Sequence, residues 1–269
     1  MEQLKEYTLG SGHLHIQEFE GELPTEWDRF FKSTDNLIGR IKGGAAFAYT
    51  TEKYEDEDDL GYVVIEEITK EKVTMKSGVM TWIPETLTRL CSTARTEELD
   101  DGVIRVKIGG LGNQSNTRYV IGFEHKDKNL RVIIVGRNTE GFTFDFKQDS
   151  ATVIDCQFRA EAADGEGTLI IIDDMRRAPV LGSLALSGIN LGFNSFYKNY
   201  TADTTATETT ITAAAKTSGN TVTITSGNET VESGGKITLA EGENKIVVEV
   251  KNASNKKFIY NITVNKAAA

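Results

Sequence analysis

Acidic side chains gather in two places where they could bind a cation or take part in acid–base chemistry. The run EDEDD, Glu55–Asp59, is contiguous, whereas a calcium loop spaces its carboxylates at alternate positions around a glycine. The second group surrounds Cys156 in the segment 151–174, where the sequence DGEG, Asp164–Gly167, separates two strand-like stretches. An Asp-Gly pair between strands is typical of a tight turn. Both acidic segments are therefore predicted to be solvated turns, and we expect no metal and no cofactor.

The remaining reactive residue types lack the partners that chemistry would need. His13 and His15 alternate on one expected strand and should point the same way, but no third ligand follows at the spacing of a zinc site. We expect them on a surface strand face. Cys91 is predicted in the middle of a helix, facing the core, where thiolate formation is disfavoured. The loop 109–116, GGLGNQSN, lacks the Lys-Ser/Thr of a phosphate-binding loop. Nothing here predicts an enzyme.

The elements around these residues are expected to be mostly β-strands. In the segment 152–161, polar residues alternate with Ile154, Cys156, Phe158 and Ala160, which is the period of a half-buried strand. The run TLIIIDD, 168–174, has no alternation until its end and predicts a strand covered on both sides, paired with 152–161 as a hairpin. Strands are expected at Leu14–Phe19, Gly44–Thr50, Tyr62–Ile68, Lys72–Ser77, Val103–Ile108, Tyr119–Glu124, Leu130–Val135, Phe142–Phe146, Thr152–Glu161 and Thr168–Ile172.

One helix is expected, over residues 83–99. Leu87, Leu90, Cys91 and Ala94 fall on one apolar stripe, and Pro84 suits the first turn because its missing N–H costs nothing there. This helix should lie across a sheet.

Composition divides the chain into two domains. Residues 1–177 hold 22 Lys and Arg against 33 Asp and Glu, whereas residues 178–269 hold 8 against 7 and are rich in Thr, Ser, Asn and Gly. We expect a first domain over 1–177, a linker over 178–183, a β-sandwich over 184–266 and a frayed end over 267–269. The acidic first domain argues against tight binding to nucleic acid.

No secretory signal or membrane-spanning run is recognised, so we expect a protein made and kept inside a cell, at least initially, with its two cysteines as free thiols. The apolar residues of the second domain alternate cleanly between turn signals about ten residues apart. That rhythm is typical of a β-sandwich.

The first 177 residues resemble a major tail (tail tube) protein of a tailed bacteriophage infecting Gram-positive bacteria. The segments that carry the resemblance are LGSGHLHIQEFEGELP, NLIGRIKGGAAFAYT, LGYVVIEEITKEKVTMKSGVMTW and DSATVIDCQFRAEAADGEGTLIIIDD, in that order. The rest resembles a cadherin-like or bacterial immunoglobulin-like β-sandwich. Its motifs appear as 184–188 (LALSG), Tyr200 and 260–264 (YNITV).

These resemblances imply a mainly β protein: a tail-tube-type sandwich or barrel flanked by one helix, followed by a small immunoglobulin-like sandwich. Subunits would form hexameric rings that stack into a tube for DNA passage, in a virion tail assembled in the host cytoplasm. Other partners would be the tape measure, tail-end and baseplate proteins. The acidic loop 52–60 would be an arm that orders when rings stack, with Tyr54, Glu55, Asp56, Glu57, Asp58, Asp59 and Leu60 as candidate assembly residues.

A domain of about 85 residues in each of six subunits would not fit inside such a tube, so the sandwich should project outward. That favours a long non-contractile tail and leaves residues 184–266 to decorate the surface or bind host glycans. The strongest alternative is an adhesin with an immunoglobulin-like module. A carboxylate-pair glycosidase is the third alternative. It would need two acidic side chains about 5–10 Å apart across a cleft, and the sequence gives no such pairing to predict.

Overall fold

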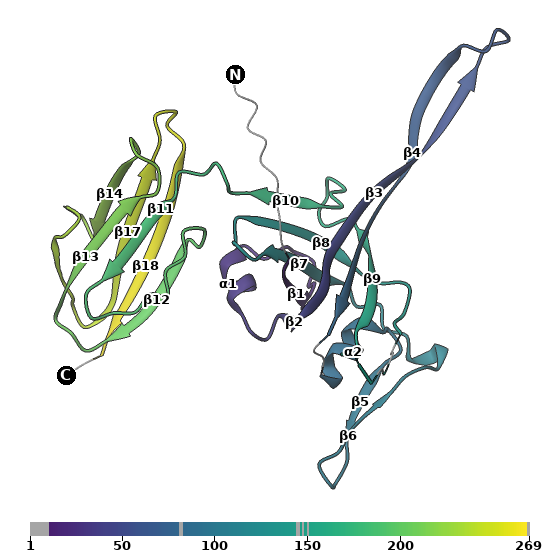
Figure 1. Cartoon of the computed structure of the whole chain (residues 1–269), viewed down its shortest axis with the longest axis horizontal. Coiled ribbons are helices and arrows are strands. Elements are labelled where there is room, and N and C mark those ends of the chain that lie inside the picture. The colour runs from purple at the N-terminus through teal and green to yellow at the C-terminus, as the bar shows by residue number, and fades with distance from the viewer. Residues whose placement is uncertain (1–10, 81–82, 144–145, 147, 150, 268–269) are drawn as a thin grey trace. The chain divides into compact units, whose positions relative to one another are not determined.

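The described part of the chain folds mainly into β-strands, with two short α-helices and one 3-10 turn, η1 (Leu111–Asn113), in the N-terminal part. A computed structural model describes residues 11–80, 83–143, 146, 148–149 and 151–267. The chain divides into two compact units, Met1–Asp173 and Asp174–Ala269, which we describe separately (Figure 1).

The first unit is organised around one sheet in the strand order β2-β1-β7-β8-β9-β4-β3, with β10 added beside β8. Neighbours along the main path are antiparallel. The strands are β1 (Gly12–Glu18), β2 (Leu37–Gly39), β3 (Ile41–Glu57), β4 (Val63–Val79), β7 (Tyr119–His125), β8 (Leu130–Asn138), β9 (Ile154–Glu161) and β10 (Ile171–Asp174).

An apolar cluster lies on each face of this sheet, and each cluster includes one helix. Helix α2 (Pro84–Leu90) contributes Leu87 and Leu90 to the larger cluster, which includes the apolar side of β9. The predicted alternation of β9 is confirmed, because Ile154, Cys156, Phe158 and Ala160 are all buried in this cluster. Helix α1 (Trp27–Lys32) packs Phe30 and Phe31 against β7 and β8 on the opposite face.

The helix expected over 83–99 is much shorter than predicted. It ends at Leu90, and Cys91 follows in an extended conformation as the C-cap, half-buried rather than in a helix interior. The chain then enters β5 (Arg95–Glu98), which pairs with β6 (Ile104–Lys107). The pairing of β5 with β6 therefore prevails over the helical periodicity that predicted one helix over 83–99. The expectation of a single helix is also wrong, because the chain forms a second helix, α1. Its six residues are too few to show a helical repeat in the sequence.

The expected hairpin of 152–161 with 168–172 is only half right. Asp164–Gly167 does form a turn: the Asp164 carboxylate accepts hydrogen bonds from Glu166 N and Thr168 N, each at 3.0 Å. However, β9 pairs with β8 and β4, and β10 pairs with β8 rather than with β9. Strand β10 is not covered on both sides either, since Ile172 is exposed.

Other expected elements differ in extent. The expected strands at 44–50, 62–68 and 72–77 fall within β3 and β4, which are 17 residues long, except that Tyr62 lies in the turn before β4. In the expected strand 142–146, residues 142, 143 and 146 lie outside any strand, and 144–145 fall outside the described residues.

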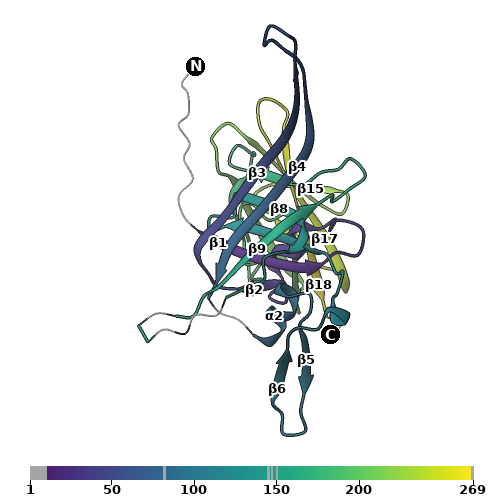
Figure 2. The same ribbon diagram turned by 90° about the vertical axis from the view of Figure 1, so that its right-hand side faces the viewer.

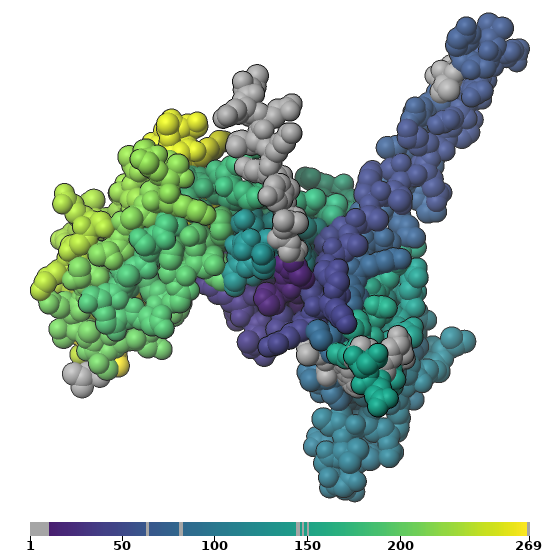
Figure 3. All heavy atoms as spheres, viewed as in Figure 1, coloured from purple at the N-terminus to yellow at the C-terminus, as the bar shows by residue number. Residues whose placement is uncertain are grey.

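Two ribbons project from the first unit in opposite directions. The outer halves of β3 and β4 form the longer one, and β5 with β6 form the shorter one (Figures 1 and 2). In the space-filling view the β3–β4 ribbon stands clear of the rest of its unit (Figure 3).

The second unit is a two-layer sandwich. A three-stranded sheet, β11-β13-β16, faces a five-stranded sheet, β12-β18-β17-β14-β15, in which β12 and β18 run parallel. The strands are β11 (Leu181–Leu186), β12 (Asn199–Thr204), β13 (Glu208–Ala215), β14 (Thr221–Ser226), β15 (Glu229–Val231), β16 (Lys236–Thr238), β17 (Gly242–Lys251) and β18 (Lys257–Lys266).

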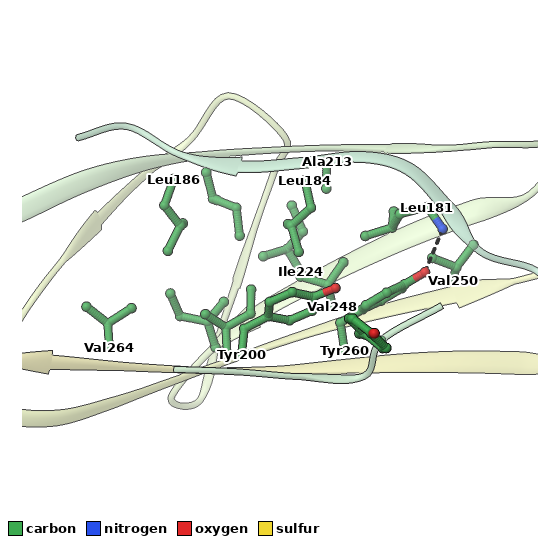
Figure 4. Packing of buried hydrophobic residues seen from close by; sticks show 14 of the residues in the cluster. Leu181, Leu184, Leu186, Tyr200, Ala213, Ile224, Val248, Val250, Tyr260 and Val264 are labelled. Atoms are coloured by element: carbon green, nitrogen blue, oxygen red, sulfur yellow. Dashed lines mark hydrogen bonds between the residues drawn. The ribbon is translucent and has the colours of Figure 1, made fainter. Parts of the chain in front are cut away.

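The motif residues of this unit build its core. Leu184, Leu186, Tyr200 and Tyr260 are buried between the sheets, and the Tyr260 hydroxyl accepts a hydrogen bond from Leu181 N at 2.8 Å (Figure 4). The segment 178–183, expected as a linker, contains the buried Val180 and Leu181 and the start of β11. Of the expected frayed end, residues 268–269 lie outside the described part.

Candidate functional site

The β3–β4 ribbon leaves the sheet where the pairing of β4 with β9 ends. That pairing runs from Val79 to Thr74, and beyond Thr74 the two strands pair only with each other. At the far end the Asp58 carboxylate accepts hydrogen bonds from Leu60 N and Tyr62 N, both at 2.9 Å, and Gly61 adopts a φ of 80°. An aspartate that bonds the backbone two residues on, together with a glycine at positive φ, makes a defined turn.

Polar pairs across the strands stiffen this ribbon. Lys70 forms an ion pair with Glu52 at 2.7 Å, Lys53 forms one with Glu66, and the Tyr49 hydroxyl donates to Glu71 at 2.6 Å. Exposed pairs of this kind each contribute little, but their cross-strand placement fixes the register.

The tip combines apolar side chains with unpaired carboxylates. Residues 52–67 carry eight acidic residues and one lysine. Leu60 is 79% exposed and Tyr62 is 67% exposed. Among the described side chains, no cation lies within ion-pair distance of Glu55, Asp56 or Glu57. A lone two-stranded ribbon is marginally stable in water, and long exposed strands are templates for pairing with another chain. The ribbon therefore exposes both apolar side chains and strand edges in the described structure.

The seven predicted assembly residues all lie at this tip, but they are not a loop. Tyr54–Glu57 belong to β3, and only 58–62 form the turn between the strands. Sequence analysis missed the exposed Tyr49, Ile65 and Ile68 on the same ribbon. The signal that could have found them is the strand-like composition of 41–79, interrupted by a single turn sequence, DDLGY.

The other candidate residues do not assemble into a reactive centre. Burial raises the pKa of Cys156 to about 12, so its thiol stays protonated, and its Sγ donates to Ser77 O at 3.3 Å. Within the described ranges, no three His, Cys, Asp or Glu side chains come together in a way that could hold a metal ion. Beside Cys156, a groove of about 490 Å³ is lined by side chains of both charges, including Lys42, Lys76, Glu140 and Asp155.

The two histidines of β1 have different surroundings. His13 is exposed, as expected, but His15 is 5% exposed and packs its ring edge-on against Phe31, with centroids 5.3 Å apart. The surface prediction for His15 is wrong because α1 covers this part of β1. Desolvation, with the positive charges of His13, Lys128 and Arg131, lowers the pKa of His15 to about 4.

A buried ionic cluster lies beside His15. Arg131 is 4% exposed, and its guanidinium donates to Glu124 at 3.2 Å and to Asp28 of α1 at 3.3 Å. It also lies over the Phe31 ring, 4.8 Å from the centroid. Because breaking one buried partner leaves an uncompensated charge, this cluster fixes α1 to the sheet.

The two layers and buried tyrosines of the second unit define an immunoglobulin-like sandwich. A family model described as a cadherin-like beta sandwich domain matches residues 181–267. The C-terminal unit is thus a cadherin-like domain, as its motifs predicted. No curated protein matches the chain. Neither helix in the described part of the chain is long and apolar enough to cross a membrane.

Proposed function

We propose that this chain is the repeating structural subunit of a bacteriophage tail tube. The first unit would form hexameric rings that stack into a tube for DNA passage, and the cadherin-like domain would decorate the outside of a long non-contractile tail. The subunit would be assembled in the host cytoplasm and would meet the tape measure, tail-end and baseplate proteins. The first unit carries no detected family match, so this proposal rests on its sequence resemblance and on its surface.

The observation that supports the proposal best is the β3–β4 ribbon. In a monomer, two strands that extend beyond their sheet and leave Leu60 and Tyr62 exposed to water would not stabilise the fold. A subunit that contacts other copies would bury these side chains and cover the free strand edges. Its unpaired carboxylates keep the ribbon soluble until a partner arrives.

A deletion of Glu55–Asp59 tests the proposal. We expect wild-type protein to form rings or tubes about 100 Å across in negative-stain electron microscopy, the size expected for six such units. The deletion variant should remain folded but monomeric, because it shortens the ribbon without touching either core. A matched control deletes 253–255, the turn between β17 and β18, and should assemble normally. Normal tubes from the Glu55–Asp59 deletion would refute the assignment.

The cadherin-like domain favours a second candidate function, that of a glycan-binding or cell-surface adhesin. A wild-type protein that stays monomeric at high concentration and binds host-wall glycans through residues 184–266 would support this alternative over the tail tube.

A further inference from the structure

One part of the first unit's sheet is bare on one side. On the α1 face, Phe30 and Phe31 cover β7 and β8, but the apolar cluster under α1 contains no residue of β3, β4 or β9. On that face the side chains of β3 and β4 beside β9 are small or basic: Ala46, Ala48 and Thr50 on β3, and Lys72, Thr74 and Lys76 on β4. Strand β9 adds Arg159 at the centre, with Gln157 and the carboxylates of Asp155 and Glu161 further along the same strand.

The strand register brings the three cations together. Arg159 lies opposite Thr74, midway between Lys72 and Lys76, which are about 13 Å apart along the strand. All three side chains are exposed. Among the described residues, no carboxylate lies within ion-pair distance of any of them. We call the surface formed by Lys72, Lys76 and Arg159, with the small residues between them, the basic face.

The basic face is unusual in a unit whose acidic residues outnumber its basic ones by 33 to 22 over 1–177. Asp155 and Glu140 border one end, in the groove shared with Lys76. The neighbouring Arg137 is already neutralised by Glu161 at 2.8 Å. The excess of positive charge therefore lies around Lys72 and Arg159. The side chains of Ala46, Ala48 and Thr50 leave the surface beside them flat.

The ribbon tip has the complementary character. It presents the unpaired Glu55, Asp56 and Glu57 within about 7 Å of strand, a length that fits between Lys72 and Lys76, with Tyr54 and Leu60 beside them. The tip cannot reach the basic face of its own chain. Lys72 pairs with Thr50, and Asp58 lies eight residues further along the same extended ribbon, about 26 Å away.

We infer that the basic face is the docking site for the acidic ribbon tip of a second copy of this chain. The inference rests on the proposed function and adds the acceptor surface to it. The contact is head-to-tail: each copy offers a tip and accepts one, so it propagates through an assembly instead of closing as a two-fold dimer. Tyr54 and Leu60 would be buried on the flat Ala46–Thr50 surface.

A charge-swap experiment on the full chain tests this contact. The tip variant carries Glu55→Lys, Asp56→Lys and Glu57→Lys, and it leaves Asp58 to form the turn. The face variant carries Lys72→Glu, Lys76→Glu and Arg159→Glu. Each variant alone opposes like charges, so we expect at least tenfold weaker self-association by sedimentation velocity and no tubes. In an equimolar mixture each tip meets a face of opposite charge, and assembly should return.

Rescue in the mixture requires both variants to be folded, so it separates a lost contact from misfolding. A control with the same change of charge, Lys216→Glu with Lys245→Glu and Lys256→Glu on the cadherin-like domain, should assemble like wild type. If the wild type assembles and the tip and face variants do too, the docking site is wrong and the proposed function stands. If the wild type never assembles, both fail. Wild-type binding to a DNA duplex that the face variant loses, with self-association unchanged, would assign the face to nucleic acid and overturn the inference.

Discussion

His15 shows how one residue's environment differs from its sequence pattern. Its Nδ1 has no hydrogen-bond partner among the described atoms, and its ring lies between β1 and the aromatic side chains of α1. Leu14 and Ile16 on either side are also buried, in the cluster on the opposite face. The alternation of His13 and His15 correctly places them on one face. The alternation does not indicate that α1 covers His15 and leaves His13 exposed.

The burial of His15 predicts a loss of stability in acid. The pKa of His15 is about 4 in the folded chain against 6.5 in an unfolded one, so between these values the unfolded state binds a proton that the folded state does not. Stability should fall as the pH drops from 6.5 to 4, by up to about 3 kcal/mol. Urea unfolding followed by tryptophan fluorescence measures this for the first unit, which contains both tryptophans.

The matched variant is His15→Leu, which keeps an apolar side chain under α1 but cannot titrate. Asp28, Glu124 and Arg131 face the same region in both proteins, so the informative quantity is the difference in unfolding free energy between the wild type and the variant. The stability of the wild type relative to His15→Leu should fall steadily as the pH drops from 6.5 to 4. A parallel course for both proteins would contradict the assignment.

At the scale of elements, the seating of α1 depends on a glycine in β7. A Cβ on Gly122 would lie 2.6 Å from Phe30 Cε1 and 2.8 Å from Phe31 Cε1. These rings are themselves held by edge-to-face contacts with each other and with Trp27. The absent side chain therefore lets the helix approach the sheet.

Gly122→Ala should destabilise the first unit by about 1–3 kcal/mol, the usual cost of overpacking a core. The unfolding midpoint in urea would fall, and the emission of Trp27 would change as α1 moves outward. Gly165→Ala is the control, because a Cβ at that position meets nothing within 4 Å. Equal stabilities for the two variants would show that α1 is not held by this close approach.

At the scale of the whole molecule, the two units have separate cores and different charge. The cluster of buried residues in the cadherin-like domain contains none from the first unit's sheet, and residues 178–269 are nearly neutral. Both the ribbon and the basic face belong to the first unit. The surfaces proposed for assembly are thus independent of the second.

A chain that ends at Arg177 should therefore still assemble. We expect it to form tubes like those of the full-length protein but thinner, because the outer decoration is missing, as electron microscopy would show. Failure of this folded, truncated chain to form tubes would mean that the cadherin-like domain takes part in the contacts between copies.

The sequence by itself determined the local patterns and the mainly β class. Alternation identified the buried side of β9 and the core of the sandwich, and the Asp-Gly pair identified the turn at 164–167, because these features depend on neighbours in the chain. The cadherin-like domain was recognisable for the same reason. Its motif residues are the ones that fill its core.

Only the tertiary structure decided which strands pair and which surfaces stay bare. Strand β10 pairs with β8 rather than with β9, and residues 95–98 leave the expected helix because β6 offers them a partner. His15 is buried because α1 crosses it. The acidic run Glu55–Asp59 stands at the end of a ribbon because β3 and β4 continue to pair beyond the rest of the sheet, and Arg159 joins Lys72 and Lys76 on one face because β9 pairs with β4. Such pairings depend on long-range competition between strand edges, which local sequence does not record.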